Sequence, residues 1–294
     1  MFTKYYFIVN PVAGGGKKLP WLSAISSFGA NQGLKFETVL TKAPKHATEL
    51  ARKAAEKYEV VVAVGGDGTV NEVGSGLINT RAVLGIVPAG SGNDFSKELG
   101  YSKNIRKDLQ LLISGQVAFA DVGLLNEKDY FFNAFGVGFD GEVAAHARAF
   151  LKYGRGFVGY LLSVLSTLSS YHFHRVRITI DSHEPIDKEI FFVAVANGST
   201  YGGGFNVAPG AEINDGFFNI CIVDKTGKLY ALRQIPKFMK GKHVNLPIVH
   251  ILTGKNVNIA ADDLLQAQLD GELPARSRNF LIKILPKKIK IIRP

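Results

Sequence analysis

The chain has 294 residues, 46% of them hydrophobic and 20% charged, which is ordinary for a globular protein with a sizeable core and room for two domains. This composition excludes intrinsic disorder. The single cysteine, Cys221 in the apolar run FFNICIV, excludes a disulfide framework and predicts a buried thiol in a reducing cytosol.

The formal net charge of +10 favours an anionic partner, which means a nucleotide, a nucleic acid or an acidic membrane surface. The sequence lacks an aromatic RNA-binding signature, a zinc-ligand cluster and a helix-turn-helix pattern, so an acidic membrane surface is a better candidate than a nucleic acid. The chain begins directly with a strand pattern and has no apolar run of the roughly 18 residues that a spanning helix needs. We therefore expect a soluble, cytoplasmic protein.

The first predicted strand, Lys4 to Val9, ends at Asn10-Pro11 and leads into a glycine-rich loop with Lys17 and Lys18. The spacing excludes a Walker A loop, because Pro11 stands where its first glycine belongs and Lys18 where its Ser or Thr belongs. What remains is a positive, amide-rich loop or, alternatively, a solvated turn. A helix, a strand and a second helix are predicted next, over Leu19 to Phe28, Phe36 to Leu40 and Pro44 to Lys57.

The stretch VVVAVGGDGTVNEV predicts a buried strand, Val60 to Val64, a glycine turn and a helix that runs to Asn79. Glycines let the backbone approach a ligand closely, and the helix N-terminus directs N–H groups and a positive dipole at the same place, so the loop suits phosphate. Asp67 would repel phosphate unless a divalent cation intervenes, which suggests a Mg²⁺ or substrate-orienting role. Thr69 and Glu72 alternatively form a T-x-x-E capping box.

A second strand and glycine turn follow at Val83 to Val87 and PAGSGNDF, with Ser91 and Asp94 spaced as a capping pair for the next helix. Two glycine turns at the carboxyl ends of neighbouring parallel strands build one crevice, which is where open α/β sheets bind ligands. A helix over Ile105 to Ser114 and a strand over Ala118 to Val122, which carries Asp121, complete this domain.

From Lys128 onward the pattern changes to long alternating strands, which indicate an antiparallel second domain. The expected strands cover Tyr130 to Phe135, Val176 to Ile180, Glu189 to Ala196, Phe217 to Val223 and Val257 to Ala261. Gly136, Gly138 and Gly141 spell G-x-G-x-x-G. No acidic residue follows about 20 residues later and no parallel partner strand follows either, so we reject a dinucleotide fingerprint. We interpret these glycines instead as the site of a tight backbone crossing.

Three later segments have two interpretations each. Phe150 to His174 is either a core-facing helix or an apolar wall with a basic rim for acyl chains and anionic lipid. The basic residues are Lys152, Arg155, His172, His174 and Arg175. Asp215-Gly216 and Asp270-Gly271-Glu272 each read, by themselves, as hairpin turns. The tail Ile282 to Pro294 alternates apolar and basic residues and predicts a final strand that returns to the first domain.

Six segments, in order along the chain, resemble motifs of the diacylglycerol kinase catalytic family, the ATP-dependent lipid kinases that include sphingosine kinases and are related to NAD kinases and phosphofructokinases. They are N-P-x-x-G at Asn10, T-x-x-x-x-[DH]-A at Thr41, GGDGT with VNEV at Gly65, P-x-G-[ST]-x-N-D-[FL] at Pro88, N-G-x-x-x-G-G-G at Asn197 and D-G-E at Asp270. The resemblance covers essentially the whole chain and is to the bacterial diacylglycerol kinase-like enzymes.

The resemblance implies a site residue by residue. The D-G-E motif supplies the general base, and whether Asp270 or Glu272 takes the proton stays open. A structural Mg²⁺ is implied at Asp215 and the backbone carbonyls of Glu212 and Phe217, with Asp94 and Asp121 in the same charge network. Asp67 acts beside the phosphates. The implied nucleotide site consists of Asn10, Pro11, Gly14, Thr41, Gly65, Gly66, Asp67, Gly68, Thr69, Asn71, Glu72, Gly90, Ser91 and Asn93.

We therefore expect a two-domain protein. Residues 1–124 form a nucleotide-binding α/β domain with a parallel sheet like that of NAD kinases and phosphofructokinases, completed by a C-terminal strand at 284–294, and residues 125–283 form an antiparallel β-sandwich domain. The resemblance implies Mg²⁺-dependent transfer of the γ-phosphoryl group of ATP to a lipid alcohol such as diacylglycerol, held in a cleft between the two domains. We expect a role in phospholipid biosynthesis, transient contact with an anionic membrane surface and no binding of nucleic acid.

Two alternatives stay open. An NAD kinase would share GGDGT, but its NE lies further downstream, so NE directly after GGDGTV favours the lipid branch. A non-catalytic nucleotide or lipid sensor is the other alternative, and the retention of every candidate acid argues against it. The sequence indicates neither the particular lipid alcohol nor the oligomeric state.

Overall fold

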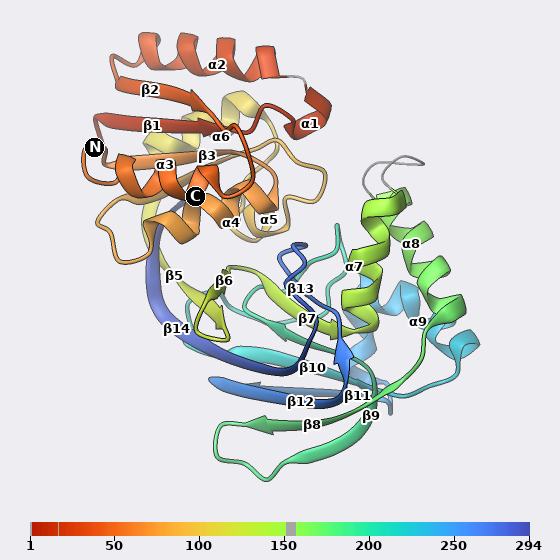
Figure 1. Ribbon diagram of the computed structural model, residues 1–294. Helices are drawn as coiled ribbons and strands as arrows, with labels where there is room; N and C mark the ends of the chain where they lie inside the picture. Colours follow the sequence, from red (N-terminus) through yellow and green to blue (C-terminus); the bar gives the residue numbers. More distant parts are fainter. Residues whose placement is uncertain (1, 17, 151–156) are drawn as a thin grey trace. The chain divides into compact units, whose positions relative to one another are not determined.

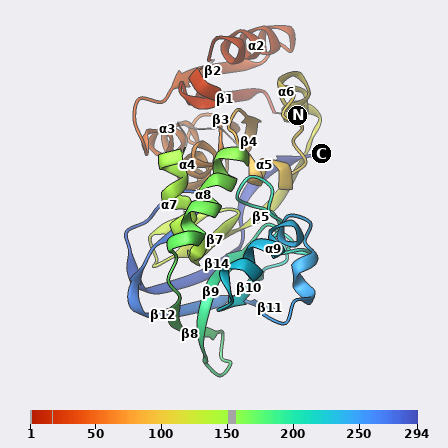
Figure 2. The same ribbon diagram turned by 90° about the vertical axis from the view of Figure 1, so that its right-hand side faces the viewer.

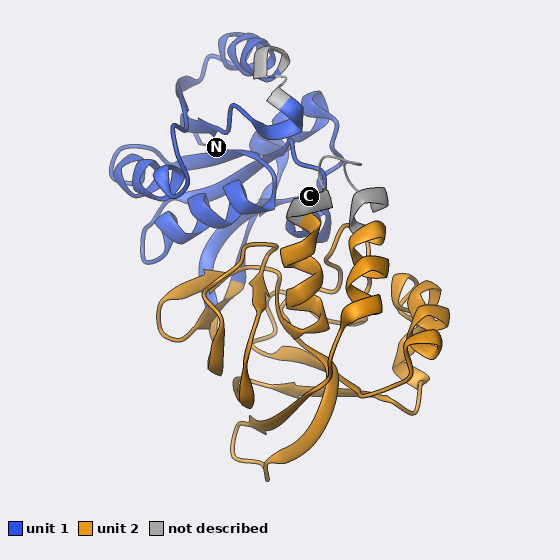
Figure 3. Cartoon of the chain, turned by 45° about the vertical axis from the view of Figure 1, so that its right-hand side comes forward, with its two compact units in different colours: residues 1–120, 287–294 blue, residues 121–286 orange. Residues whose placement is uncertain are grey.

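The structure is a computed structural model that describes residues 2–16, 18–150 and 157–294. The chain divides into two compact units, shown in different colours in Figure 3. Unit 1 consists of residues 1–120 and 287–294, and unit 2 of residues 121–286. The chain leaves unit 1 within strand β5 (Gln116–Leu125) and returns within strand β14 (Ser277–Arg293).

Unit 1 is built on a parallel sheet with the strand order β2-β1-β3-β4-β14 (Figure 1). Strands β3 and β4 are buried along their whole length, as expected where helices cover both faces of a parallel sheet. This burial explains why they read as continuous runs of Val, Leu and Ile. The strands are β1 (Lys4–Val9), β2 (Lys35–Leu40), β3 (Val60–Gly65), β4 (Val83–Pro88) and the end of β14.

Helices lie on both faces of this sheet. On one face, Ile25 of α2 and Leu112 of α6 pack with Phe7 and Val62 in one apolar cluster. On the other face, α3 and α4 contact the strands and each other, and Gly76 allows their close approach, since a Cβ there would lie 2.5 Å from the carbonyl oxygen of Thr48. The helices are α1 (Ala13–Gly16), α2 (Lys18–Asn31), α3 (His46–Ala54), α4 (Asp67–Leu77), α5 (Asp94–Glu98) and α6 (Ile105–Ser114).

Unit 2 is built from antiparallel strands. Its main sheet has the order β11-β10-β9-β8-β12-β14, β7 pairs with both β9 and β13, and β5 pairs with β6. The strands are β6 (Asp129–Phe131), β7 (Ala134–Gly138), β8 (His174–Ile180), β9 (Ile186–Ala196), β10 (Phe218–Asp224), β11 (Val249–Gly254), β12 (Asn256–Leu265) and β13 (Ala267–Leu269).

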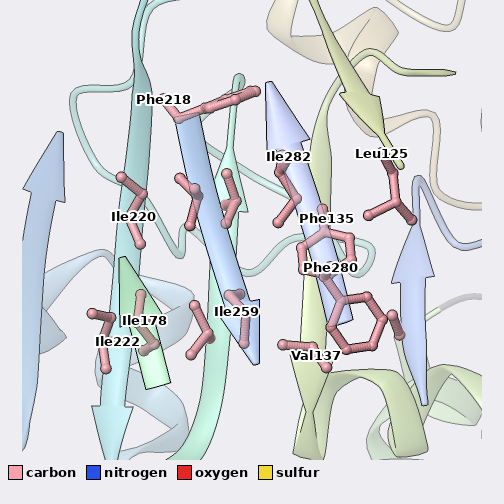
Figure 4. Packing of buried hydrophobic residues seen from close by; sticks show 14 of the residues in the cluster. Leu125, Phe135, Val137, Ile178, Phe218, Ile220, Ile222, Ile259, Phe280 and Ile282 are labelled. Atoms are coloured by element: carbon pink, nitrogen blue, oxygen red, sulfur yellow. The ribbon is translucent and has the colours of Figure 1, made fainter. Parts of the chain in front are cut away.

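The core of unit 2 lies between its layers of strands. Figure 4 shows Phe135 of β7 against Phe280 of β14, with their ring centroids 5.5 Å apart, among aliphatic side chains such as Ile178 and Ile259. Successive strand residues point to opposite faces, so β9 and β10 also supply a second apolar cluster on their other face.

This second cluster packs against three helices of unit 2, α7 (Phe139–Phe150), α8 (Phe157–Ser170) and α9 (Lys228–Met239), which are seen from another side in Figure 2. A short 3-10 helix, Lys242–Asn245, follows α9. Cys221 lies in this cluster, and burial raises the pKa of its thiol to about 12, so its predicted structural role is confirmed. No described helix is long and apolar enough to cross a bilayer.

The predicted fold class, a parallel α/β sheet followed by antiparallel strands, is confirmed. Strand β1 and helix α6 have the predicted bounds. Gly136, Gly138 and Gly141 do not form a dinucleotide site, because β7 pairs with β9 and β13 in antiparallel fashion. Helix α9 and strand β11 were not predicted.

Candidate active site

The first glycine turn of unit 1 joins β3 to α4. Gly66 precedes the helix, which begins at Asp67, so the free N–H groups of its first turn lie in this loop. The side chain of Asn10 donates a hydrogen bond from Nδ2 to Thr69 Oγ1 at 3.0 Å and so holds the loop after β1 against it. Gly65 is required here, since a Cβ would lie 2.3 Å from Thr69 Oγ1.

The second glycine turn joins β4 to α5 and lies directly beside the first, as the sequence predicts. A Cβ on Gly90 would lie 2.4 Å from the Cα atom of Gly66, so the two loops meet backbone to backbone. Asn93 holds the turn, because its Oδ1 accepts from the N–H of Gly90 at 2.9 Å and its Nδ2 donates to the carbonyl of Gly90 at 2.7 Å. Gly14 joins them, since a Cβ there would lie 3.2 Å from the carbonyl oxygen of Ala89.

Two carboxylates gather at these turns. A Cβ on Gly92 would lie 2.8 Å from Asp67 Oδ2 and 3.5 Å from Asp94 Oδ2. Asp67 Oδ1 accepts a hydrogen bond from the N–H of Phe95 at 3.3 Å, and Asp94 Oδ1 is 2.9 Å from Lys97 Nζ. Exposed main-chain amides beside clustered carboxylates can bind a polyphosphate whose charge is shared with a divalent cation.

Lysine side chains complete the charge balance at the turns. Burial lowers the pKa of Lys103, the nearby Lys97 lowers it further, and Asp94 and Asp67 oppose that fall. The charges of both carboxylates therefore act on the ammonium group of Lys103. Lys17 lies outside the described residues, and the side chain of Lys18 is not described either.

Two predicted helix caps are wrong. Thr69 lies inside α4 rather than before it, and Glu72 caps a different helix, because its carboxylate accepts from the N–H groups of Lys45 at 2.8 Å and Ala47 at 3.1 Å at the start of α3. Ser91 does not cap α5, since the residue before that helix is Asn93 in a left-handed conformation with no side-chain cap. The error at Glu72 arises because its donors belong to α3, and the error at Ser91 arises because α5 begins at Asp94, three residues after Ser91.

The remaining predicted nucleotide residues lie around the same strand ends. Pro11 follows Asn10 in the loop after β1, and Thr41 follows β2, where its N–H donates to the carbonyl of Val9 at 2.9 Å. Asn71 lies in α4, where its Oδ1 accepts from Ser75 Oγ at 3.4 Å, and Gly68 belongs to the first turn of that helix. Their contact with a nucleotide stays a prediction.

In unit 2, the D-G-E motif forms a tight turn after β13. Asp270 and Gly271 have φ angles of 48° and 85°, and Leu269 and Glu272 exchange two main-chain hydrogen bonds across them. Both oxygens of Asp270 also accept main-chain N–H groups of the segment that leads into the first residue of β7. These donors are Phe132 at 2.8 Å, Asn133 at 2.9 Å and Ala134 at 3.0 Å. Asp270 therefore anchors the turn, while Glu272 is exposed.

An apolar pocket lies in unit 2 beneath α7, α8 and α9. Its walls include Val164 and Leu168 of α8, Phe192 of β9, and Ile235 and Phe238 of α9. The predicted apolar wall over Phe150 to His174 therefore contributes to a pocket through α8. Of the predicted basic rim, Lys152 and Arg155 lie outside the described residues, whereas His172 and Arg175 are exposed and His174 Nδ1 lies 3.2 Å from Asp263 Oδ2. The role of this rim stays a prediction.

One buried carboxyl belongs to this pocket. Asp140 is 7% exposed and accepts a hydrogen bond from Gln268 Nε2 at 3.0 Å and another from Tyr201. Burial raises the pKa of its carboxyl to about 6, although these two hydrogen bonds oppose the rise. Gln268 Oε1 accepts from the N–H of Gly271 at 2.9 Å. A short polar chain thus links the D-G-E turn to the polar part of the pocket.

Sequence reasoning named the motif around Asp140 but not its role. Gly136 makes room for the carboxylate, because a Cβ there would collide with Asp140 Oδ2. The available signal was an acid directly after a buried strand, at the start of a helix and beside Phe139. Gln268 gave no such signal, because its partner in the pocket, Asp140, is 128 residues away in the sequence.

Three of the predicted structural Mg²⁺ residues of unit 2, Glu212, Asp215 and Phe217, lie in the loop before β10, and Asp121 of β5 contacts this loop. Asp121 Oδ2 accepts from the N–H of Gly216 at 2.6 Å, and Asp215 Oδ1 accepts from the N–H of Phe217 at 2.8 Å. Glu212 is exposed on the same loop. Oxygen donors of this kind suit Mg²⁺. Three or more acidic, histidine or cysteine side chains do not gather into a metal cluster anywhere in the described ranges. Asp94 lies in unit 1, so its shared network with Asp121 and Asp215 stays a prediction.

Comparison with known proteins agrees with these motifs. Residues 4–125 match the family model of the diacylglycerol kinase catalytic domain, and residues 133–293 match that of the YegS C-terminal NAD kinase beta sandwich-like domain. The chain is 30% identical over 269 residues to the diacylglycerol kinase of Bacillus subtilis, covering 90% of this chain and 88% of that protein.

Solved structures show the same fold. A diacylglycerol kinase of Bacillus anthracis superimposes with a TM-score of 0.83 at 29% identity, covering 100% of this chain and 98% of the other. An NAD kinase of Archaeoglobus fulgidus, solved in complex with ATP, superimposes with a TM-score of 0.53 at 13% identity, covering 98% and 93% of the two chains, and this likeness concerns the fold alone. The chain belongs to the diacylglycerol kinase family of lipid kinases, through both its catalytic-domain and its sandwich-domain segments.

Proposed function

We propose that the protein transfers the γ-phosphoryl group of ATP to the hydroxyl of a lipid alcohol such as diacylglycerol. The observation that carries this proposal is the apolar pocket of unit 2, whose one carboxyl, Asp140, is joined through Gln268 to Gly271 of the D-G-E turn. Such a pocket suits the acyl chain of a lipid alcohol, with Asp140 as a polar partner for the hydroxyl of its head, and it does not suit a dinucleotide.

Unit 1 binds ATP in this proposal. Phosphoryl transfer needs little covalent help from the protein and depends on alignment and on the neutralisation of charge. The amides of the two facing glycine turns and the N-terminus of α4 supply positive potential for the phosphates. Asn10 fixes the first turn and Asn93 the second, so the amides are held in place before the nucleotide arrives.

The fit of Mg²⁺ rests on the donors present. Asp67 and Asp94 would hold a phosphate-bound ion in unit 1, and Asp215 with the carbonyls of Glu212 and Phe217 would hold a structural ion in unit 2. When bound beside the phosphates, Mg²⁺ neutralises part of their negative charge.

Glu272 is the better candidate for the general base. Both oxygens of Asp270 accept main-chain hydrogen bonds, and a carboxylate that already accepts three N–H groups is a weak proton acceptor. Glu272 sits on the same tight turn and is exposed. Asp140 positions the acceptor hydroxyl within unit 2, and Glu272 takes its proton as the hydroxyl oxygen bonds to the γ-phosphorus. The bond between the γ-phosphorus and the β,γ-bridging oxygen breaks, and ADP leaves with that electron pair.

An NAD kinase-like reaction is the second candidate, supported by the shared fold. The apolar lining of the pocket argues against it, because a dinucleotide would leave its polar groups without partners. A non-catalytic sensor is the third, and the presence of Asp67, Asp94, Asp140 and Glu272 together argues against it. We further propose that the protein works in the cytoplasm, in phospholipid biosynthesis, and touches the membrane transiently.

The test is transfer of labelled phosphate from ATP to a panel of lipid alcohols in mixed micelles, with NAD offered in parallel. We expect Mg²⁺-dependent labelling of at least one of diacylglycerol, monoacylglycerol, a sphingoid base or an isoprenoid alcohol. Labelling of NAD and of no lipid would overturn the proposal, and nucleotide binding without transfer to any acceptor would support the sensor instead.

A further inference from the structure

The outer faces of α8 and α9 carry exposed apolar side chains that the proposed reaction does not use. Leu229 of α9 is 62% exposed, and Leu162 and Leu165 of α8 are 40% and 41% exposed. Tyr230, Leu232 and Met239 of α9 are also exposed. The two helices contact each other, so these side chains belong to one part of unit 2 (Figure 2). Exposed apolar groups in such numbers on adjacent helices mark a binding surface rather than ordinary protein surface.

The charge of this surface has one sign. From Lys225 to Ala261 the sequence contains no Asp or Glu, whereas six Lys and Arg residues lie between Lys225 and Lys242. Two of the six serve the fold, because Lys225 pairs with Glu189 and Lys228 donates to the carbonyl of Ser169 at 2.7 Å. The other four are exposed and form no ion pair with any acidic group that the structure describes, namely Arg233, Lys237, Lys240 and Lys242.

Apolar and basic groups alternate along one line of α9. Leu229, Arg233 and Pro236 recur at intervals of four and three residues, which places them on the same side of α9. Lys240 follows directly after the helix, and all four are exposed. Ile235 and Phe238 lie on the opposite side of the helix and line the apolar pocket of unit 2. One helix therefore offers an apolar wall to the pocket and an apolar, basic face to solvent.

We propose that the docking face, defined as Leu162, Leu165, Leu229, Arg233, Lys237 and Lys240, binds the surface of a bilayer that contains anionic phospholipid. Leu side chains enter the headgroup boundary while Lys and Arg meet the phosphates, which is the chemistry of an interfacial helix. This inference rests on the proposed function, because the helices that wall the lipid pocket are the ones that meet the membrane from which the lipid comes.

Charge argues against a second copy of the chain as the occupant. Two copies that meet through this face would bring Arg233, Lys237 and Lys240 of one chain against the same residues of the other, and like charges at an interface are repulsive. An anionic bilayer instead lowers the free energy of every basic residue that approaches it.

The test is sedimentation of the full chain with vesicles of phosphatidylcholine alone or with phosphatidylglycerol added. We expect binding that needs phosphatidylglycerol and weakens with salt. Each basic residue near an anionic surface changes partitioning by about fivefold, so Arg233→Gln with Lys237→Gln and Lys240→Gln lowers it by about 100-fold. Leu229→Ala with Leu165→Ala lowers it by about tenfold or more through lost apolar burial.

A matched control removes three basic residues from exposed positions on or between the strands of unit 2, Lys255→Gln with Arg278→Gln and Lys283→Gln. This control has the same net charge as the first variant and keeps full vesicle binding if the docking face is right. Equal loss of binding in both variants would mean a general charge effect and would overturn the proposal. A dimer in lipid-free solution that the Leu229→Ala variant dissociates would assign the face to a second copy.

A separate readout distinguishes this inference from the proposed function. Transfer of phosphate from ATP to a water-soluble short-chain diacylglycerol needs no bilayer and is unchanged in the triple variant. Normal transfer by the wild-type protein without vesicle binding would refute the docking face alone. Vesicle binding that depends on the docking face, without transfer to any lipid, would refute the kinase proposal alone.

Discussion

Glu272 and Asp270 lie two residues apart in one turn, and the structure predicts opposite consequences for their isosteric amide variants. Asp270→Asn replaces an oxygen acceptor with an NH₂ donor that faces main-chain N–H groups of residues 132–134. Glu272→Gln changes an exposed group. The first variant therefore weakens the fold of unit 2, whereas the second removes the proposed base and leaves the fold intact.

The magnitudes follow from the contacts. A hydrogen bond to a charged group contributes about 1.5–3 kcal/mol, and an unsatisfied buried donor costs about 1–3 kcal/mol. Asp270 is half-buried and keeps one amide oxygen as an acceptor in the variant, so we expect Asp270→Asn to lower the free energy of unfolding by about 2–3 kcal/mol. Glu272→Gln should change it by less than about 0.5 kcal/mol and lower kcat by about 10²- to 10⁴-fold.

The assay joins hydrogen exchange with lipid phosphorylation. In Asp270→Asn the main-chain amides of Phe132, Asn133 and Ala134 should exchange faster than in the wild-type protein, and transfer per folded molecule should fall by less than about tenfold. In Glu272→Gln these amides should stay protected. If Asp270→Asn keeps their protection and loses transfer while Glu272→Gln stays active, Asp270 is the base and the reasoning is wrong.

Three further predictions concern the other parts of the site. The pKa of Asp140 rises from 3.8 to about 6 on folding, so its contribution to stability is full below about pH 4 and is lost as the pH rises through about 6. Between these limits, the free energy of unfolding of Asp140→Asn minus that of the wild type should increase by up to about 3 kcal/mol in urea titrations. A difference that does not change with pH would contradict the burial of this carboxyl. Gly90→Ala should weaken ATP binding by at least about tenfold in calorimetry, because its Cβ would lie 2.4 Å from the Cα atom of Gly66, whereas Gly227→Ala, with no atom within 4 Å, should bind ATP normally. Asp67→Ala should abolish transfer to lipid and leave a folded protein with a cooperative melting transition, because Asp67 is only half-buried and lies at the first position of α4; an active variant would refute its assignment to the phosphates.

Local pattern predicted much of the fold. The runs before Gly65 and Gly90 are rich in Val and Ile and end in glycine, and such runs specify buried parallel strands and tight turns whatever the rest of the chain does. The two turns were expected to meet because neighbouring parallel strands end at the same edge, and they lie backbone to backbone.

What sequence reasoning missed depends on partners that are distant in the chain. Glu72 was assigned to its own helix, whereas its donors belong to α3, and the three main-chain donors to Asp270 precede it by more than 130 residues. Helix α9 was missed because Pro236 and closely spaced basic residues interrupt its apolar period. The pocket combines residues from several segments, and no single segment carries its pattern.

The most direct test of the lipid kinase proposal is to locate the acceptor by photolabelling. A diacylglycerol analogue with a photoreactive group on its acyl chain would be irradiated with the full chain, and the labelled peptides identified by mass spectrometry. We predict label on Val164, Phe192 or Phe238 of the pocket, competed by unlabelled diacylglycerol and blocked by Ala231→Trp, which fills the pocket. Label that is competed by diacylglycerol but lies on other parts of the chain, and is unaffected by Ala231→Trp, would contradict the assignment of the pocket to the lipid substrate.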